Sequence, residues 1–315
     1  MFRFKIFLLA LLLPMISRAQ LLSNGTFDLN LNGIRHWVKI AGAEHHTVPL
    51  VIIHGGPGGN HYVFERMAGK ELEKFRTVIY YEQRGSGRSA AAPGGVYTIP
   101  LLVSDLEALR KELKLEQIIP LGYSFGASLA LEYTLVHPTR VTGLILESFA
   151  TLQDSSVLLG QMANFYSQAT AINRPKLDSI LKSNSSLASK NMAFWNVARR
   201  DGVIRFLFHD PEKGRKVFGM WAESRISNTG EVMKALMQEN RAINLYDAAS
   251  GVAAPALILT GVYDRNGALP ASMRIKQEIK GSRIKFFENS AHFPDVEEPE
   301  LFVNTIRDWL RTLKY

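Results

Sequence analysis

The sequence has no cysteine among its 315 residues. The chain therefore has no disulfide framework, no thiol nucleophile, no thiolate metal site and no cysteine for lipid attachment. It also lacks any run of five or more lysines and arginines, so its formal charge of +8 is scattered along the chain. We expect a solvated basic surface and no nucleic-acid partner.

Apolar runs long enough to span a membrane are missing as well. The apolar segment 6–13 near the N-terminus follows two basic residues and precedes small residues at Ser17 and Ala19. A membrane anchor needs about 20 apolar residues, so a cleavable signal peptide over residues 1–19 is favoured over an anchor. The sequence thus predicts a secreted or periplasmic protein with no stable membrane anchor.

Hydrophobic residues make up 46% of the chain, which is enough for a large packed core. Short apolar runs alternate with stretches of helical period, which is typical of an α/β fold with a mainly parallel sheet of about eight strands. Asn32-Gly33 joins the first two strands into a hairpin that supplies an antiparallel edge. The expected strands are 27–31, 34–40, 50–53, 77–81, 118–121, 141–146, 257–260 and 284–287, and the expected helices are 101–113, 124–136, 271–278 and 301–313.

The alternation of strands and helices stops in the middle of the chain. Residues 151–250 show helical periods, aromatic clusters and no convincing strand. We interpret this region as a helical cap inserted into a core formed by residues 20–150 and 251–315. Most of its aromatic side chains are expected to pack inside the cap, and a few to line a small apolar pocket as well.

A serine lies where the sequence predicts that a strand turns into a helix. Gly122-Tyr123-Ser124-Phe125-Gly126 follows an apolar run and precedes a helical stretch. In such a turn the two glycines let strand and helix approach closely, and the serine hydroxyl is exposed at the carboxyl edge of the sheet. The pattern alone is weak, because a serine at an ordinary helix N-cap also fits it.

A serine nucleophile needs a base and an acid that orients the base. Asp264 and His292 each follow a predicted strand. Because the carboxyl ends of parallel strands lie at one edge of a sheet, we expect Ser124, His292 and Asp264 to meet there as nucleophile, general base and orienting acid. There are alternatives to these catalytic roles. Asp264 could be only an Asx-turn residue, in which case Asp247 is the rival acid, and His292 could be an ordinary surface histidine.

The loop after the strand at 50–53 is a candidate for binding the oxyanion. His54-Gly55-Gly56-Pro57-Gly58-Gly59 offers backbone N–H groups that no side chain obstructs. We assign the N–H groups of Gly56 and Phe125 as the oxyanion donors, with Gly55 as the substitute for Gly56. His54 is interpreted as shaping this loop. The remaining histidines have no partner at metal-ligand spacing, so no metal or cofactor is expected.

These motifs, in this order, resemble those of a known family. His-Gly-Gly-Pro-Gly at 54–58, Gln-Arg-Gly-Ser-Gly-Arg-Ser at 83–89, the serine turn at 122–126, Gly-Val-Tyr-Asp at 261–264 and the segment around His292 are similar to those of proline iminopeptidases. The resemblance covers residues 30–150 and 251–315. It implies an α/β-hydrolase fold and removal of an N-terminal residue, often proline, from peptides without metal or cofactor.

The chain departs from the family pattern at positions that bear on the substrate. Glu82 stands where the family usually has aspartate, and Arg265 stands beside the predicted acid, where some relatives have a glutamate that binds a substrate amine. A cation at that position would repel a substrate ammonium. We predict instead that Glu223 and Glu239 of the cap, with Trp221, bind the substrate.

The sequence therefore predicts an exported serine hydrolase that acts on a small peptide or a small acyl substrate. An aminopeptidase that releases an N-terminal proline or small residue through an acyl-enzyme is favoured. An esterase or amidase is the alternative, because the same catalytic groups cleave esters, and a non-catalytic binding protein is the third possibility. The oligomeric state is left open.

Overall fold

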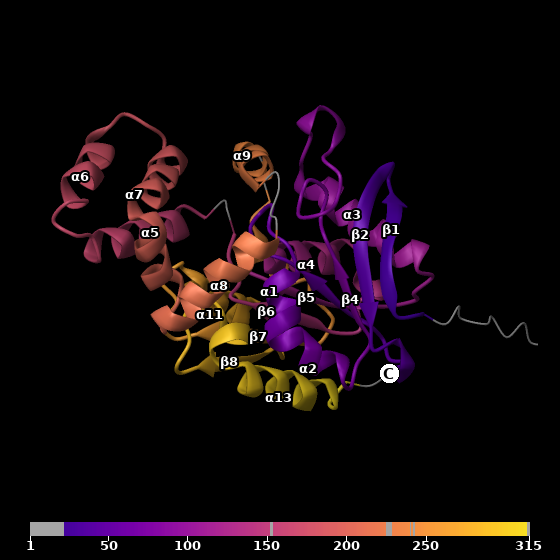
Figure 1. The fold of residues 1–315 in the computed structure, drawn as a ribbon. Coiled ribbons are helices and arrows are strands. Elements are labelled where there is room, and N and C mark those ends of the chain that lie inside the picture. Colours follow the sequence, from indigo (N-terminus) through magenta and orange to yellow (C-terminus); the bar gives the residue numbers. More distant parts are fainter. Residues whose placement is uncertain (1–21, 152–153, 225–228, 240, 242, 314–315) are drawn as a thin grey trace, which may run out of the picture.

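The computed structural model describes residues 22–315 except 152–153, 225–228, 240, 242 and 314–315 (Figure 1). The predicted signal peptide, residues 1–19, lies outside the described residues. At the centre is an eight-stranded sheet with the strand order β1-β2-β4-β3-β5-β6-β7-β8. Its strands are β1 (Gly25–Leu31), β2 (Ile34–Ala41), β3 (Leu50–Ile53), β4 (Val78–Tyr81), β5 (Ile119–Tyr123), β6 (Leu144–Glu147), β7 (Ala256–Gly261) and β8 (Arg283–Phe287).

The pairing of the strands confirms the predicted α/β class. β1 and β2 form the expected antiparallel hairpin, and β2 runs antiparallel to β4. The six strands from β4 to β8 along the sheet are parallel to one another. One strand boundary was predicted too early: residue 141 forms only an isolated bridge to Ile118, and β6 begins at Leu144.

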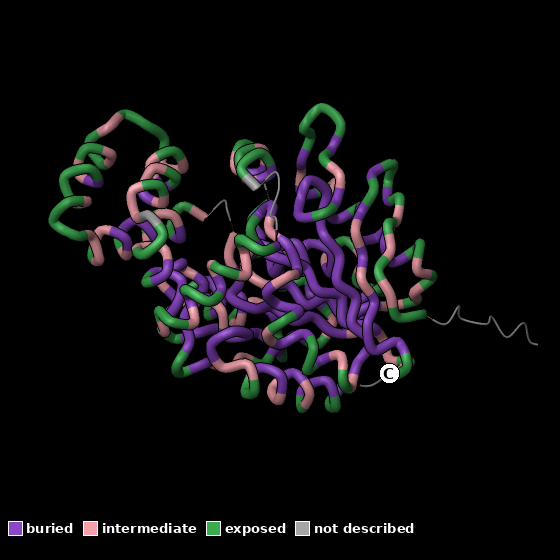
Figure 2. The backbone as a smooth tube through the Cα atoms, in the orientation of Figure 1, coloured by how far each residue is buried: buried purple, intermediate pink, exposed green. Residues whose placement is uncertain are grey.

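Helices cover both faces of the sheet. Leu50 and Ile52 of β3 pack on one face, and Val51 and Ile53 pack on the other. The first face is covered by α2 (Lys70–Glu73) and α13 (Pro299–Leu310); the second is covered by α3 (Ile99–Glu112), α4 (Phe125–Val136) and α11 (Ala268–Glu278). Both faces of the central strands are buried, as Figure 2 shows, and these strands are accordingly continuous apolar runs.

The segment between β3 and β4 is helical, which the sequence analysis does not predict. It comprises α1 (Tyr62–Phe64), the π-helical turn η2 (Glu65–Gly69) and α2. Phe64, Ala68 and Leu72 are spaced four residues apart and are buried against the sheet. This spacing is the helical signal, and the preceding glycine-rich loop obscures it.

In its described part, the segment between β6 and β7 forms helices joined by loops and contains no strand. It contains α5 (Ser155–Ser167), α6 (Arg174–Lys182), α7 (Leu187–Leu207), α8 (Pro211–Ser224), α9 (Thr229–Gln238) and α10 (Leu245–Ala249). Figure 1 shows α5, α6 and α7 as a lobe that projects beyond the sheet. The last helix, α10, packs on α4 and α11 of the core. In the described part of the chain, no helix has the length and apolar character needed to cross a membrane.

Candidate active site

Ser124 occupies the predicted turn between β5 and α4. Its backbone has φ 55° and ψ −124°, an unusual conformation for a residue other than glycine. The turn is possible because Gly122 and Gly126 have no side chains. A Cβ on Gly122 would lie 2.1 Å from the carbonyl oxygen of Gly126, and a Cβ on Gly126 would lie 2.0 Å from the carbonyl oxygen of Ile53. The N–H of Ser124 donates to the Glu147 carbonyl at 2.9 Å, which holds the turn against β6.

The structure brings the three predicted catalytic residues together. His292 Nε2 lies 3.0 Å from Ser124 Oγ, and His292 Nδ1 lies 2.7 Å from Asp264 Oδ2. His292 and Asp264 are both buried. A proton on Nδ1, facing the carboxylate, leaves the Nε2 lone pair free to accept the serine hydroxyl proton. The rival acid Asp247 is exposed on α10, where it accepts a hydrogen bond from Asn244.

Asp264 is also an Asx-turn residue, so two alternatives of the sequence analysis hold together. Its Oδ1 accepts the N–H of Asn266 at 2.7 Å, while Oδ2 faces the imidazole. The side chain of Asn266 in turn lies 3.2 Å from His292 Nε2, and its Oδ1 accepts a hydrogen bond from Gln161 at 2.9 Å. The sequence analysis does not find Asn266 as a site residue, because only the folded chain shows the contacts with His292 and the cap.

The predicted oxyanion donors line the same cavity as Ser124. Phe125 is the first residue of α4, a position at which the backbone N–H has no acceptor inside the helix. Gly56 has φ 126°, a conformation that favours glycine. Its neighbour Gly55 must also be small, because a Cβ there would lie 2.9 Å from Ser124 Cβ.

His54 shapes the oxyanion loop, as the sequence analysis proposes. Its Nδ1 donates to the Gly55 carbonyl at 2.9 Å, and its Nε2 accepts the N–H of Gln83 at 3.0 Å. The Gln83 side chain donates to the His54 carbonyl at 2.8 Å. Burial lowers the pKa of His54 to about 4, so the ring is neutral at pH 7. Both ring nitrogens of His54 are engaged, so neither is available to accept a proton from Ser124.

Glu82 connects the loop that follows β4 to the oxyanion loop. Its Oε1 lies 2.9 Å from His61 Nδ1, and its Oε2 accepts the backbone N–H of Arg88. His61 follows Asn60, whose carbonyl accepts the Tyr123 hydroxyl at 2.7 Å. The glutamate in place of the family's usual aspartate is therefore part of a buried network that positions the cavity wall.

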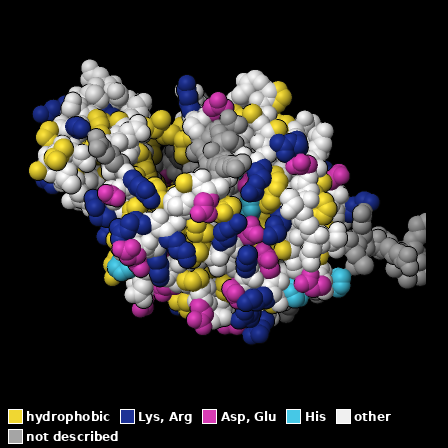
Figure 3. Space-filling model, in the orientation of Figure 1, with side chains coloured by type: hydrophobic (Ala, Val, Ile, Leu, Met, Phe, Trp, Pro, Cys, Tyr) yellow, Lys and Arg dark blue, Asp and Glu magenta, His cyan; other side chains and the backbone are white. Residues whose placement is uncertain are grey.

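A cavity of about 520 Å³ opens over Ser124 and His292. The cap side chains that line it are mostly apolar, among them the predicted Trp221. Figure 3 shows hydrophobic side chains along the hollow beside the α5–α7 lobe. The aromatic residues buried inside the cap, Phe194, Phe206 and Phe208, serve packing. Trp195 does both, since it lines the cavity and packs edge-on against Phe206.

The two cap glutamates do not line this cavity, which argues against their predicted role. Glu239 accepts the backbone N–H of Ile99 at 3.0 Å and so caps the N-terminus of α3. Glu223 is exposed and accepts the hydroxyl of Tyr62 at 3.2 Å. Arg265 also lies outside the cavity lining, and its guanidinium donates to the Arg205 carbonyl at 3.0 Å. None of these three charged side chains therefore lines the cavity.

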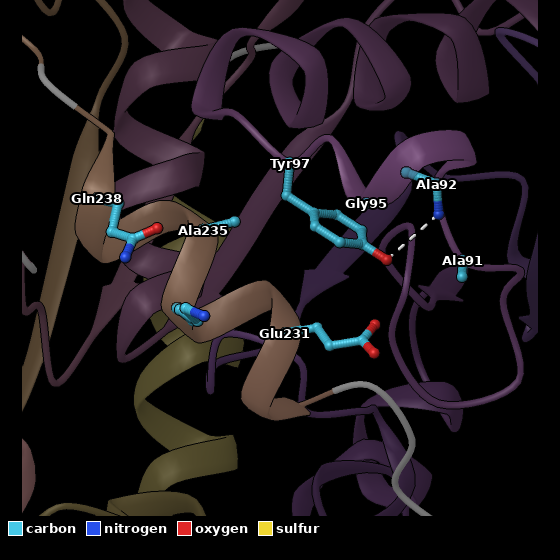
Figure 4. A pocket seen from close by; sticks show the side chains of 8 residues that line it. Ala91, Ala92, Gly95, Tyr97, Glu231, Ala235 and Gln238 are labelled. Atoms are coloured by element: carbon cyan, nitrogen blue, oxygen red, sulfur yellow. Dashed lines mark hydrogen bonds between the residues drawn. The ribbon is translucent and has the colours of Figure 1, made fainter.

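A second cavity, of about 410 Å³, lies between α9 and the loop that carries Ala91 and Ala92. Figure 4 shows Glu231 reaching from α9 toward this loop, and Tyr97, whose hydroxyl accepts the Ala92 N–H at 3.3 Å. None of the predicted site residues lines it. Across the part of the chain that the structure describes, no group of three or more His, Asp or Glu side chains is arranged to hold a metal ion.

The sequence of residues 48–299 matches the family model of the alpha/beta hydrolase fold. The chain belongs to this α/β-hydrolase family. In an alignment 298 positions long, it is 29% identical to a proline iminopeptidase of Lactobacillus crispatus; the alignment covers 88% of this chain and 95% of that protein. Such matches place it among the proline iminopeptidase-like α/β-hydrolases and identify it as a hydrolase.

Solved structures show the same α/β-hydrolase fold. The proline iminopeptidase-related protein of Thermus thermophilus superposes with a TM-score of 0.74 at 22% identity, covering 93% of this chain and 99% of that one. An esterase of Exiguobacterium antarcticum superposes with a TM-score of 0.66 at 23% identity, covering 91% of this chain and 100% of that one. The fold is thus shared by proteins named for peptide and for ester substrates.

Proposed function

We propose that this α/β-hydrolase is a serine aminopeptidase that releases an N-terminal proline or small residue from short peptides. The observation that carries the proposal is the contact chain Ser124–His292–Asp264 at the floor of an apolar cavity. The names of the sequence relatives support the peptidase assignment. The cap encloses the cavity and would limit the length of the substrate.

The proposed reaction is acyl transfer through Ser124. His292 Nε2 takes the hydroxyl proton as Oγ attacks the substrate carbonyl, and Asp264 stabilises the imidazolium that forms. The N–H groups of Gly56 and Phe125 donate to the oxyanion. His292 then gives its proton to the leaving amine, and a water molecule repeats the sequence to release the acid.

An esterase or amidase acting on small acyl substrates is the second candidate. Two observations favour it: neither Glu223 nor Glu239 lines the cavity, and esterases are among the structural neighbours. The catalytic groups and their order of action are the same for both candidates, so only the substrate distinguishes them.

A fluorophosphonate probe followed by two substrate panels tests the proposal. Wild type is expected to be labelled at Ser124 and to cleave prolyl and alanyl p-nitroanilides faster than acyl p-nitrophenyl esters corrected for their spontaneous hydrolysis. Ser124→Ala should abolish both signals. Turnover of esters alone would reject the peptidase, and absence of labelling would support the non-catalytic binding protein.

We also propose that the chain is exported, with residues 1–19 removed as a signal peptide. The basic residues, the short apolar run and the small residues before the cleavage point support this. Expression of the full chain with a C-terminal tag in a bacterial host, followed by fractionation and N-terminal sequencing, is expected to give a periplasmic protein that begins at Gln20. A full-length protein in the cytoplasm would contradict export.

A further inference from the structure

Two buried carboxyl groups lie beside the cavity and take no part in the reaction described above. Glu147 is the last residue of β6, and Asp295 lies in α12 (Pro294–Glu297), three positions after His292. Glu147 is 0% exposed and Asp295 is 4% exposed. The backbone N–H of Asp295 donates to Glu147 Oε1 at 3.2 Å, which holds the two groups together.

Asp295 faces the catalytic cavity, where it lines the wall together with Ser124 and His292. Among the described residues that line this cavity, it is the one carboxylate, and none of them is lysine or arginine. Apart from His292, the other lining groups are apolar or neutral. The local charge that a ligand meets beside the catalytic serine is therefore negative and comes from this position.

In the part of the chain that the structure describes, one oxygen of each carboxyl group lacks a hydrogen-bond donor. When both are ionised, Asp295 Oδ1 and Glu147 Oε2 have no donor among the described residues. Burial raises the pKa of each, and the charge of Asp295 further raises that of Glu147. One proton held between the two groups satisfies both oxygens in the free protein. A cation that enters the cavity can satisfy Asp295 as well.

We propose that Asp295, supported by Glu147, binds the α-ammonium group of the substrate's N-terminal residue. The proposal rests on the aminopeptidase function and assigns to the core the role that the sequence analysis assigns to Glu223 and Glu239. The ammonium pairs with the Asp295 carboxylate from the cavity side, while Glu147 keeps the shared proton. The pair then carries one negative charge, which matches the single positive charge of the ligand.

The cavity chemistry favours an ammonium over other ligands. A neutral acyl group forms no ion pair with Asp295, and an anion is repelled by it. Trp195, Trp221 and Phe293 provide an apolar wall of the same cavity that suits a small aliphatic ring. A cyclic secondary ammonium offers both a positive charge for Asp295 and an aliphatic ring for the apolar wall.

Protection of Ser124 against a fluorophosphonate tests this site without any substrate turnover. The probes are L-prolinol, which carries the ammonium and has no cleavable bond, and cyclopentylmethanol, its neutral analogue. In wild type, L-prolinol is expected to protect at a concentration at least tenfold lower than cyclopentylmethanol. Asp295→Asn should remove this preference, since the amide has no charge to pair with the ammonium. Equal preference in wild type and Asp295→Asn overturns the proposal.

Two further variants separate the site from general effects on the fold. Glu223→Gln removes a carboxylate outside the cavity and is expected to retain the wild-type preference; loss of the preference in this variant instead of Asp295→Asn overturns the proposal. Glu147→Gln replaces the shared proton by an amide that donates to Asp295. Because neutral Glu147 and the amide both donate to Asp295, this variant is expected to keep the wild-type preference for L-prolinol, and loss of the preference overturns the proposal even where Asp295→Asn does not fold.

The pH dependence of protection has a defined sign. The titratable groups that face Asp295 are Glu147 from β6, Tyr123 from β5 and His292 from the loop after β8. The pKa of Asp295 is raised to about 6, so protection by L-prolinol is expected to weaken as the pH falls through this value. A profile in wild type that does not weaken as the pH falls overturns the proposal, and this measurement needs no variant.

The experiment separates this inference from the aminopeptidase function. If L-prolinol protects through Asp295 but prolyl substrates are not cleaved, the ammonium site stands and the peptidase assignment fails. If prolyl substrates are cleaved and protection does not depend on Asp295, the site is overturned and the peptidase assignment stands.

Discussion

The core side and the cap side of the cavity are built in different ways. On the core side, single polar atoms have fixed partners: His292 has Asp264 on one ring nitrogen and Ser124 on the other. On the cap side, apolar side chains are held by packing, as where Phe165 stacks on Phe206 with ring centroids 3.8 Å apart. A hydrogen-bonded arrangement of catalytic groups loses its function when one atom is misplaced, whereas apolar packing tolerates substitutions of similar volume. The proposed reaction therefore depends on the core, and we expect substitutions in the cap to change the substrate.

The largest effect of breaking the core side is expected from Asp264→Asn. The new amide donates to His292 Nδ1, which places the ring proton on Nε2, where it blocks acceptance of the serine proton. We expect kcat to fall by about 10⁴-fold with little change in thermal stability. Steady-state turnover and a melting curve check this, and a fall of less than tenfold would mean that Asp264 does not orient the base.

A pair of glycine substitutions compares the two sides directly. Gly126→Ala puts a Cβ 2.0 Å from the carbonyl oxygen of Ile53, so we expect a loss of about 4 kcal/mol or more in the free energy of unfolding, or no folded protein. Gly219→Ala lies in the cap helix α8 with nothing within 4 Å of the added Cβ. There we expect a gain of about 0.5–1 kcal/mol, because alanine favours the helix. Urea unfolding of both variants measures the contrast.

The histidine of the oxyanion loop predicts how the core responds to acid. The pKa of His54 is lowered by burial from 6.5 to about 4, so the unfolded chain binds the proton first as the pH falls. The stability that the neutral ring contributes is complete above pH 6.5 and is lost between pH 6.5 and 4. The loss amounts to about 3 kcal/mol. Denaturant unfolding at several pH values should show this slope in wild type, and a His54→Asn variant that retains the full slope would refute the assignment.

The smallest effect is expected where the cap contacts the core at Glu239. Glu239→Gln removes the negative charge at the N-terminus of α3 but keeps an oxygen acceptor for the N–H of Ile99. We expect a loss of about 0.5–1 kcal/mol in the free energy of unfolding, since an anion at a helix N-terminus is favourable, and an unchanged kcat/KM. A rise in KM specific to aminoacyl substrates would instead restore Glu239 as a substrate-binding residue.

The sequence was sufficient to predict the sheet and the three residues of the contact chain, for one physical reason. Ser124, Asp264 and His292 each follow a strand, and parallel strands deliver their carboxyl ends to one edge. Strands buried on both faces also give apolar runs that are easy to recognise. The position of each motif just after a strand can be read locally in the sequence, and it predicts that residues far apart in the chain meet at one edge of the sheet.

Side chains placed by tertiary packing could not be predicted in this way. Asn266 reaches His292 because Gln161 of the cap fixes its amide, and Glu147 meets Asp295 from a distant part of the chain. The cap glutamates were assigned to the substrate by their charge alone, and the folded chain uses Glu239 to cap α3 instead. A carboxylate in a sequence does not show which donor it will meet.

A main-chain hydrogen bond joins the end of helix α7 to His292, the proposed base. The N–H of His292 donates to the Leu207 carbonyl at 3.0 Å, and the Arg265 side chain next to the catalytic acid donates to the Arg205 carbonyl at 3.0 Å. The cap is therefore not a separable cover: a rotation of α7 that pulled its last turn away would draw the imidazole off the hydroxyl. An exchange of caps between relatives has to keep this main-chain path at 205–207, even where every cavity-facing side chain is replaced.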